Sequence, residues 1–286
     1  MKIGNIEITH PDKIIFQKEK ISKFEIASYY SQVAPFMFKF LNKRLLSVIR
    51  ANQGIDKVFF KKHPNVKSKF VKPVIVEKEK QPYFYLPSEE SVVYQAQMGT
   101  VEFHIWASSL PKIDKPDIMT FDLDPDENLG LSNLRQGVKN LKQILDKLGL
   151  RAFLKTSGGK GYHVLLPFQP DCDWQTFGDF AKAVANLLQA QWPQLYTSTM
   201  KKEQRKNKIF VDWMRNGKGA TCVAPYSIRA RRGAKISMPI GWSELDKIAP
   251  DQIDIETALA RIKKKDPWED FFQVRQSISY WAEKEK

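Results

Sequence analysis

The sequence predicts an α+β fold with a largely antiparallel or mixed sheet. Three segments have the apolar spacing of amphipathic helices, and six short runs have the character of β-strands. Strands and helices do not alternate strictly along the chain, as a doubly wound parallel sheet would require. The strand-like runs span residues 101–106, 118–124, 152–155, 162–167, 209–214 and 221–229.

Each predicted helix carries its own signal. Ser22 and Glu25 have the spacing of a capping box, which opens a helix over 22–41 that we expect to bend at Pro35. The helix over 132–148 has one apolar stripe, made of Leu134, Val138, Leu141, Ile144, Leu145 and Leu148, and Gly149 follows it in the C-terminal cap position. The third helix spans 176–192 and is expected to bury Phe177, Phe180, Val184, Leu187 and Leu188.

Length and composition exclude several classes of protein. The 286 residues suffice for one large domain or two small ones, and 42% hydrophobic residues argue against disorder. No run is apolar enough to cross a bilayer, and the N-terminus lacks the hydrophobic segment of a secretion signal. Cys172 and Cys222 are too few for a disulfide framework or a four-cysteine zinc site. We therefore expect a cytoplasmic protein without a membrane partner.

Positive charge is concentrated in two stretches of a chain whose net charge is +14. Residues 196–235 carry eleven Lys and Arg against two acids, and residues 57–80 carry eight Lys against two acids. Such a concentration favours an anionic partner, of which nucleic acid is the obvious one, although a solvated basic face is the alternative. Aromatic residues alternate with the charges, so both stretches are expected to be folded.

Two acids share one face of the strand predicted over 118–124. Because side chains alternate along a strand, Asp122 and Asp124 lie on the same face. The apolar residues Met119, Phe121 and Leu123 lie on the opposite face. Carboxylate oxygens suit Mg²⁺ or Mn²⁺, although Asp-Pro-Asp-Glu-Asn is also good turn sequence. Asp212, a lone acid in a strand-like run, is the natural third carboxylate for two-metal chemistry, and its alternative is an ion pair with a nearby Lys or Arg.

A glycine-rich segment lies between two of the predicted strands. Three glycines in four positions, Gly158, Gly159 and Gly161, allow a tight turn whose N–H groups face an anion. Ser157, Lys160 and His163 converge around them, which favours a phosphate cradle over an ordinary hairpin turn. The spacing is not that of a P-loop.

Two further elements carry weaker signals. Arg229 and Arg231 lie two apart, so an extended segment would aim both guanidiniums at one phosphate, unless they form an exposed basic edge. His104 lies among apolar residues, where a histidine is most often simply packed and hydrogen-bonded. Taken together, metal-binding acids, phosphate-binding side chains and basic surface are the components needed to join a nucleotide to a nucleic-acid end.

The motifs, in order, resemble the polymerase domain of bacterial DNA ligase D, in the archaeo-eukaryotic primase superfamily. They are F-D-L-D-P, K-T-S-G-G-K-G-x-H-V, V-D-W, A-P-Y-S-x-R-A-R-x-G-A and M-P-I-x-W-x-E-L, and the resemblance extends from Ile8 to Trp268. It implies a primase-like α+β core with an RNA-recognition-like sheet. It also implies a single domain over 1–286, with a DNA- and 5′-phosphate-binding part at 1–100 and a catalytic core at 101–286.

The resemblance assigns a role to each candidate residue. Asp122, Asp124 and Asp212 would hold two Mg²⁺ or Mn²⁺ ions, and His104 would contact the nucleotide or primer end. The incoming nucleoside triphosphate would be bound by Ser157, Gly159, Lys160, His163, Arg229 and Arg231. A recessed 5′-phosphate would be held by Lys13 and Lys23, and the template by Phe59 and Phe60 with Lys62 on its backbone. Two positions depart from the family pattern, namely His10 in place of Asn and Asn52-Gln53-Gly54-Ile55 in place of P-D-G-I.

The predicted function is template-dependent addition of ribo- or deoxyribonucleotides to primer 3′ ends, at gaps, nicks and double-strand breaks during non-homologous end joining. A Ku-type protein and a DNA ligase are the partners implied, in the nucleoid region of the cytoplasm. A primase, a non-catalytic end-binding module and a metal-dependent nuclease are the alternatives. A nuclease would not need the glycine-rich turn and paired arginines to hold a triphosphate.

Overall fold

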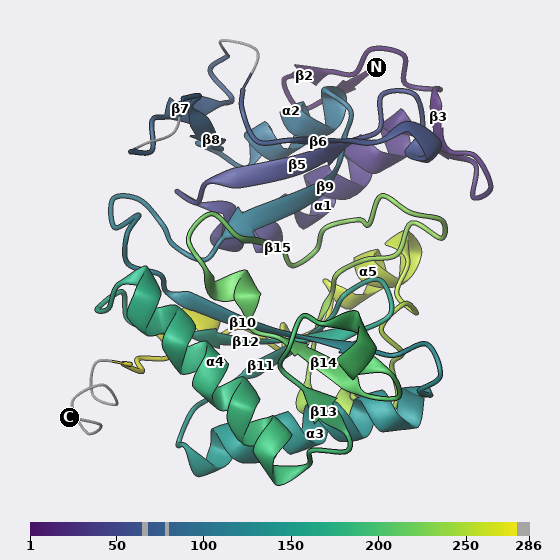
Figure 1. The fold of residues 1–286 in the computed structure, drawn as a ribbon. Helices are drawn as coiled ribbons and strands as arrows, with labels where there is room; N and C mark the ends of the chain where they lie inside the picture. The colour runs from purple at the N-terminus through teal and green to yellow at the C-terminus, as the bar shows by residue number, and fades with distance from the viewer. Residues whose placement is uncertain (65–67, 78–79, 279–286) are drawn as a thin grey trace. The chain divides into compact units, whose positions relative to one another are not determined.

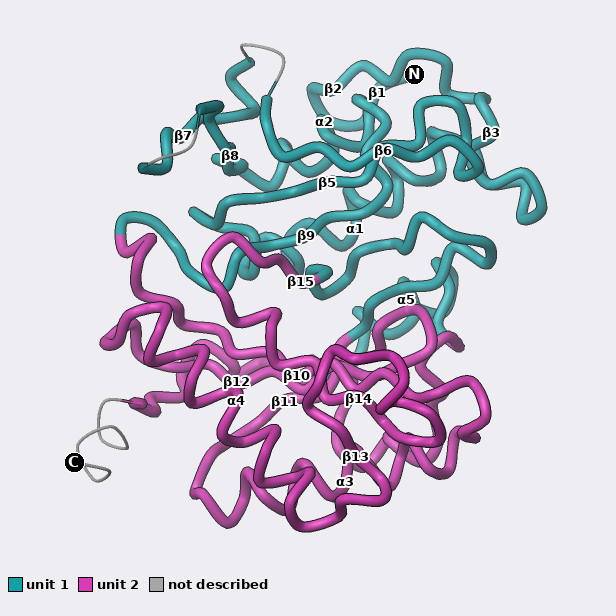
Figure 2. The backbone as a smooth tube through the Cα atoms, in the orientation of Figure 1, with its two compact units in different colours: residues 1–111, 223–238, 253–265 teal, residues 112–222, 239–252, 266–286 magenta. Residues whose placement is uncertain are grey.

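The computed structural model describes residues 1–64, 68–77 and 80–278. The chain divides into two compact units, each assembled from three segments (Figures 1 and 2). Unit 1 consists of residues 1–111, 223–238 and 253–265. Unit 2 consists of residues 112–222 and 239–252 and of the chain from residue 266 onward. Within the described residues, no helix is both long enough and apolar enough to cross a membrane.

Unit 2 is built on a six-stranded sheet in the order β13-β14-β10-β12-β11-β16. All of its pairings are antiparallel except β13 with β14, which confirms the prediction of a largely antiparallel or mixed sheet. Its strands are β10 (Ile118–Pro125), β11 (Phe153–Thr156), β12 (Tyr162–Pro167), β13 (Tyr196–Thr197), β14 (Ile209–Asp212) and β16 (Pro239–Ile240). The short 3-10 turns of this unit are η2 (Lys202–Arg205), η3 (Met214–Asn216), η4 (Trp242–Glu244) and η5 (Phe271–Gln273).

Two helices, α3 (Leu131–Lys147) and α4 (Trp174–Gln191), pack against β10 and against each other (Figure 1). The predicted apolar face of β10 is confirmed, because its alternate residues are completely buried, namely Met119, Phe121 and Leu123. The prediction for α4 is wrong at Leu187, which is 49% exposed. Leu187 and Leu188 are neighbours on a helix and face about 100° apart, so the buried Leu188 turns Leu187 toward solvent.

Unit 1 is built on a four-stranded sheet in the order β15-β9-β5-β6. The strands are β5 (Leu46–Arg50), β6 (Phe59–Lys61), β9 (Thr100–Trp106) and β15 (Thr221–Val223), at the end of which the chain enters the unit. Three small hairpins add β1 (Lys2–Ile3) with β2 (Ile6–Glu7), β3 (Ile14–Phe16) with β4 (Ile21–Ser22), and β7 (Lys72–Val74) with β8 (Tyr83–Tyr85).

The helices of unit 1 are α1 (Lys23–Leu41), α2 (Glu90–Gln97) and α5 (Ile255–Arg261), with one 3-10 turn, η1 (Ile55–Lys57). The predicted capping box of α1 is confirmed: Ser22 Oγ accepts from Glu25 N (3.2 Å), and Glu25 Oε2 accepts from Ser22 N (2.7 Å). Pro35 lies inside α1, and Tyr30 of α1 donates from its hydroxyl to Val101 O in the sheet (2.6 Å).

Two strand predictions extend too far. The run over 209–214 ends as a strand at Asp212, where Met214 N donates back to Asp212 Oδ1 (3.0 Å) and a 3-10 turn begins. The run over 221–229 ends at Val223. Tyr226 then adopts a positive φ of 67°, and a backbone bent into that region cannot continue a strand.

Candidate functional site

A row of charged side chains crosses four neighbouring strands of unit 2. In the sheet register, Asp122 of β10 lies opposite Asp212 of β14 on one side and opposite His163 of β12 on the other. His163 lies opposite Lys155 of β11. Residues paired across strands project from the same face. The three predicted carboxylates therefore share one sheet face, since Asp124 follows Asp122 by two positions.

Cations surround the central acid of this row. His163 Nε2 lies 3.4 Å from Asp122 Oδ1, and Arg215 Nε lies 3.1 Å from Asp212 Oδ2. Burial alone would raise the pKa of Asp122. The charges of His163, Arg215 and Lys155 outweigh burial and hold that pKa at about 2. Asp122 is therefore ionised at neutral pH, although it lies beside a second acid.

The two outer carboxylates have the opposite tendency. Burial and the charge of Asp122 raise the pKa of Asp124, with Asp212 adding to the effect. Burial also raises the pKa of Asp212, where the attraction of Arg215 is partly offset by the repulsion of Asp122. Two unit charges about 5 Å apart repel by roughly 3 kcal/mol at an effective dielectric constant of 20. The charged forms of Asp124 and Asp212 are therefore destabilised by burial and by repulsion among the acids, in spite of the cations nearby.

The donor set fits a hard divalent cation. Carboxylate oxygens are the preferred ligands of Mg²⁺ and Mn²⁺, and a cation there would relieve the repulsion that raises two of the pKa values. Within the described residues, however, no three His, Cys, Asp or Glu side chains are already grouped as metal ligands. Asp212 is held by Arg215 and by the N–H of Met214, and Asp122 is held by His163, so these carboxylates face protein partners.

Three residues of this network were missed by the sequence analysis. Lys155 is completely buried, and its Nζ lies 2.9 Å from His163 Nδ1. Cys222 Sγ lies 3.4 Å from the same nitrogen, and Arg215 pairs with Asp212. Alternation along a strand could have indicated Lys155, because it stands opposite His163 in the hairpin closed by the glycine-rich turn. Arg215 and Cys222 follow β14 and had no such signal.

The glycine-rich turn differs from its predicted form. Ser157 Oγ accepts from Gly159 N (3.1 Å) and Gly161 N (3.2 Å), and Gly158 N donates to Pro250 O (3.0 Å). The expectation that the glycine N–H groups face an anion is therefore wrong, because all three already have protein acceptors. The buried Ser157 fastens the turn, whereas Lys160 is exposed beyond it.

Gly161 is required by a close approach rather than by its φ angle. A Cβ at this position would lie 2.4 Å from the carbonyl oxygen of Leu123 on β10. The turn can therefore lie directly over the residue that separates Asp122 from Asp124, and any larger side chain would force it away.

In unit 1, Glu102 of β9 organises a second buried network. Its Oε1 lies 2.8 Å from His104 Nε2 and 3.0 Å from Arg229 Nε, and its Oε2 accepts from Ala230 N (2.8 Å). Burial would raise the pKa of Glu102, but His104 and Arg229 lower it to about 2. His104 is therefore an ion-paired residue on the same sheet face as Glu102. The sequence analysis named His104 and missed Glu102, two positions away.

The predicted geometry of the two arginines is wrong in one respect. Their segment is not extended, because Arg231 N donates to Arg229 O (2.8 Å) in a tight turn, and Arg229 N donates to Lys235 O (2.8 Å). The two guanidiniums nevertheless lie near one another, since burial and the charge of Arg229 lower the pKa of Arg231. Glu102 neutralises Arg229 and leaves Arg231 as the positive end of the turn.

Phe59 and Phe60 are both about half exposed, at 45% and 50%. Neighbouring residues of a strand project from opposite faces, and Phe60 pairs with Ile49, which in turn pairs with Glu102. Phe60 therefore shares the face of His104, and the two ring centres lie 5.9 Å apart. Phe59 projects from the other face. Lys62 is exposed just beyond β6.

Lys13 and Lys23 line one pocket of unit 1, with a volume of about 350 Å³. His10 and Thr9 also line it. Lys23 Nζ donates to Thr9 O (2.8 Å), and Gln97 of α2 holds Thr9 by accepting from its N–H (2.9 Å). Burial and the charge of Lys13 lower the pKa of Lys23. The two predicted lysines are thus brought together, with Gln97 as a support that had no sequence signal. Lys67 and Lys78, counted in the basic stretch 57–80, lie outside the described residues.

A sheet that carries three carboxylates on one face beside a glycine-rich turn, in a chain with basic and aromatic surfaces, is the arrangement expected of a nucleotidyltransferase of the polymerase class. The model of one protein family, described as "LigD, primase-polymerase domain", matches residues 22–268. The chain belongs to this family.

Individual relatives agree with the family. The multifunctional non-homologous end joining protein LigD of Pseudomonas aeruginosa is 36% identical over 96% of this chain, and the bifunctional LigD of Bacillus subtilis is 28% identical over 94%. The chain spans only 34% and 44% of these relatives' lengths. Among solved structures, the polymerase domain of Mycobacterium tuberculosis ligase D in complex with DNA matches 93% of this chain and 98% of its own, with 29% identity and a TM-score of 0.86. This match confirms the predicted fold class.

Proposed function

We propose that this chain adds nucleotides to primer 3′ ends in a template-dependent reaction, at gaps, nicks and broken DNA ends during non-homologous end joining. The observation that supports this most strongly is the row of Asp212, Asp122, His163 and Lys155 across four strands, with Asp124 beside it. The relatives' part in end joining, and the DNA bound by the mycobacterial polymerase domain, supply the substrate class.

In this proposal, Asp122, Asp124 and Asp212 would hold two divalent ions, Mg²⁺ or Mn²⁺. When bound, such ions lower the pKa of the attacking hydroxyl and neutralise the departing pyrophosphate. His163 and Lys155 keep Asp122 ionised and fix its orientation, and Arg215 holds Asp212 until a cation competes for it. Ser157 keeps the turn closed, and Lys160 offers its exposed ammonium to the nucleotide phosphates.

The residues of unit 1 would bind nucleic acid and nucleotide. Lys13 and Lys23 would take the 5′-phosphate across a gap, with His10 in the same pocket. Phe60 would stack on a template base, which is sequence-tolerant as repair of arbitrary ends requires, and Lys62 would contact the backbone. Arg231 and His104 would contact the nucleotide or primer end, with Glu102 positioning His104 and Arg229. Residues 1–100 would thus bind DNA and residues 101–286 carry the reaction, in a single functional domain.

Primer extension on a short gapped duplex tests this proposal. Ribo- and deoxyribonucleoside triphosphates are compared with Mg²⁺ or Mn²⁺, and the downstream strand carries a 5′-phosphate or a 5′-hydroxyl. We expect templated addition stimulated by the 5′-phosphate, and a loss of at least about a thousandfold in Asp122→Ala. Asp146→Ala, which removes an exposed acid of α3, is the matched control and should extend normally.

Other outcomes discriminate between functions. Synthesis on an unprimed single strand would favour a primase. Tight binding of the duplex with no addition under either metal would leave an end-binding module. A Ku-type protein and a DNA ligase are the proposed partners, because the relatives are about two to three times longer and are described as multifunctional or bifunctional end-joining proteins. The proposed place of action is the nucleoid.

A further inference from the structure

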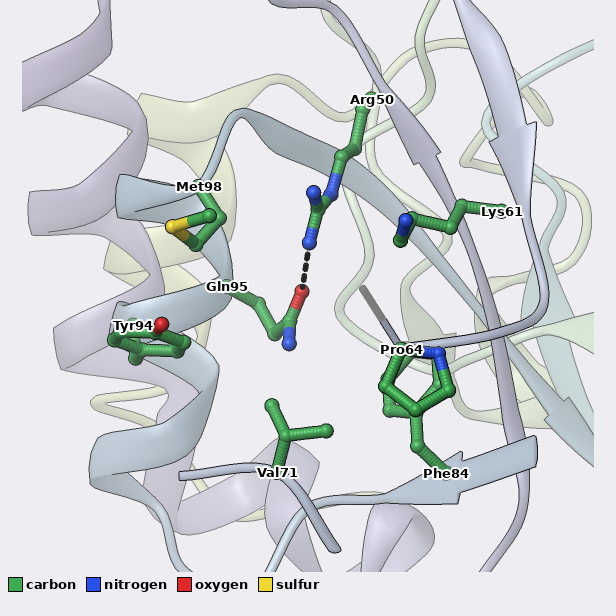
Figure 3. A pocket seen from close by; sticks show the side chains of 8 residues that line it. All are labelled: Arg50, Lys61, Pro64, Val71, Phe84, Tyr94, Gln95 and Met98. Carbon is green, nitrogen blue, oxygen red and sulfur yellow. Dashed lines mark hydrogen bonds between the residues drawn. The ribbon is translucent and has the colours of Figure 1, made fainter. Parts of the chain in front are cut away.

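A small pocket of unit 1 is lined by two cations to which the proposed function gives no role. Arg50 at the end of β5 and Lys61 at the end of β6 reach into it from neighbouring strands (Figure 3). Gln95 and Met98, from α2 and its end, close the other side. Its volume is about 20 Å³, which is room for one water-sized group, such as a single phosphate oxygen, and excludes a nucleoside. None of the described residues that line it is acidic.

The hydrogen-bonding groups in the pocket are only partly used. Arg50 Nη2 donates to Gln95 Oε1 (3.3 Å), which is the dashed contact in Figure 3. Arg50 Nε is buried and has no hydrogen-bond partner among the described residues. A buried donor without a partner is destabilising, so an acceptor brought to Nε would be stabilising.

The two charges also oppose each other. Burial lowers the pKa of Arg50, and burial together with the Arg50 charge lowers the pKa of Lys61. Lys61 pairs with Val48, which precedes Arg50 by two positions on β5. Residues two apart on a strand project from the same face, so Arg50 and Lys61 share one face of the sheet. An anion between them would remove this repulsion and supply the missing acceptor.

The position of the pocket indicates where that anion comes from. Met98 lines both this pocket and the one formed by Lys13 and Lys23, so the two are neighbours. Lys61 lies at the end of β6 in the basic stretch 57–80, on the same sheet face as the exposed Phe59 and opposite to Phe60. A nucleic-acid strand that reached the first pocket would bring backbone phosphates to the second.

We propose that the pocket of Arg50 and Lys61 is a second phosphate subsite, which takes an internal backbone phosphate of the bound nucleic acid. This inference rests on the proposed function only in assuming that the chain binds gapped DNA. The guanidinium supplies its Nε edge to the phosphate oxygens, and the Lys61 ammonium adds a third donor. The subsite reads no base, so it suits a protein that accepts ends of any sequence.

The test is a double-mutant cycle that combines a substitution in the protein with the neutralisation of one backbone phosphate of the duplex. The affinity for a gapped duplex is measured by fluorescence anisotropy for the wild type, Lys61→Met and Arg50→Met, while one backbone phosphate at a time is replaced by an uncharged methylphosphonate. We expect one position at which neutralisation weakens wild-type binding by about tenfold and leaves Lys61→Met unchanged. Lys61→Met is expected to fold normally, because the Lys61 side chain makes no hydrogen bond among the described residues.

Controls separate this subsite from its neighbours. Lys39→Met removes an exposed charge of α1 away from the pocket and should leave the coupling intact. The coupling should also persist on a duplex with a 5′-hydroxyl. If neutralising a phosphate weakens duplex binding equally in wild type and in Lys61→Met at every position, the proposal is wrong. It is also wrong if inorganic phosphate competes through Lys61 while no backbone position couples, since the pocket would then take free anions. Wild type that fails to bind the duplex would instead overturn the proposed function.

Discussion

Glu102 in unit 1 and Asp122 in unit 2 invite comparison, because both are largely buried acids with a pKa of about 2 and both are paired with a histidine. Their surroundings differ. Glu102 is a single acid that meets His104, Arg229 and a backbone N–H. Asp122 meets His163 but lies opposite Asp212 and near Asp124, whose pKa values are raised by burial and by its charge.

The difference shows which charges serve the fold and which are left for a ligand. The Glu102 network is closed, since its charges balance and its oxygens are taken. In the Asp122 row, two of the three carboxylates are destabilised as anions by burial and repulsion, as expected where cations bind. Around the closed network, unit 1 keeps surplus positive charge at Arg231 and in the pocket of Lys13 and Lys23, as expected where phosphates bind. The groups that a ligand of opposite charge would stabilise are thus carboxylates in unit 2 and cations in unit 1.

Neutralising Glu102 should have the largest effect on stability. Glu102→Gln leaves Arg229 without its partner, and the fall of the carboxyl pKa from 4.5 to about 2 corresponds to about 3 kcal/mol of unfolding free energy at pH 7. Because the folded-state pKa is depressed, this stability is fully present above pH 4.5 and is lost as the pH falls toward 2. Urea unfolding of wild type and Glu102→Gln at pH 7, 4 and 3 should show that their difference in unfolding free energy shrinks as the pH falls.

The exposed pair of Asp246 and Lys139 provides the control for this experiment. Asp246→Asn should cost less than about 1 kcal/mol at every pH, because surface pairs contribute little. Equal stability of wild type and Glu102→Gln at pH 7 would mean that Glu102 does not hold unit 1 together, and the contrast with Asp122 would fail.

Gly161→Ala should disturb unit 2 alone. The added Cβ meets the Leu123 carbonyl at 2.4 Å, so the turn or β10 must shift, at a cost of about 1–3 kcal/mol. Nucleotide addition should fall as well, since Leu123 separates Asp122 from Asp124. In the control Gly178→Ala, at a helical position of α4, the nearest atom to the added Cβ is Asn216 O at 3.9 Å, and the variant should be more stable by up to about 1 kcal/mol. Thermal unfolding of both variants would decide, and an unchanged Gly161→Ala protein would show that the close approach is not needed.

Phe59 and Phe60 separate the two faces of the unit 1 sheet. Phe60→Ala should weaken binding of a single-stranded overhang by about 1–3 kcal/mol, the usual contribution of one stacked base, because Phe60 shares the face of His104. Phe59→Ala, an equally exposed residue on the opposite face, should have a clearly smaller effect. Anisotropy titrations with one labelled overhang compare them directly. Equal losses would mean that both faces contact the strand.

The sequence predicted what depends on local pattern. Alternation gave the buried face of β10 and the shared face of Asp122 and Asp124, and the capping box placed the start of α1. The sequence could not predict the partner of Glu102, because Arg229 lies in a turn far along the chain and only tertiary folding brings the two residues together. The same holds for Arg215 and Cys222. The helix α2 was missed because it is short and has no side-chain cap at its start.

The glycine-rich turn shows a different limit. Glycine, serine and lysine at this spacing predict a tight turn equally well whether the N–H groups face outward to an anion or inward to Ser157. The choice is made by Pro250 and Ser157, whose oxygens accept from all three glycine N–H groups. Composition predicted the turn and could not predict the direction of its donors.

Neutralising Asp212 should have the smallest effect on stability and an effect of opposite sign to that of Glu102. Asp212→Asn removes a buried charge that also repels Asp122 directly opposite, and it gives up the ion pair with Arg215. We expect a net gain of a few tenths to about 1 kcal/mol, since Asn can still accept from Met214 N. The variant should be more stable than wild type at pH 7 without divalent metal, and inactive in nucleotide addition. Asp146→Asn, which loses an exposed pair with Lys142, should be slightly destabilised. If Asp212→Asn were instead destabilised by more than about 1 kcal/mol, the pair with Arg215 would outweigh the repulsion. The Asp122 row would then be as closed as the Glu102 network, and its carboxylates would not be destabilised in the absence of a metal.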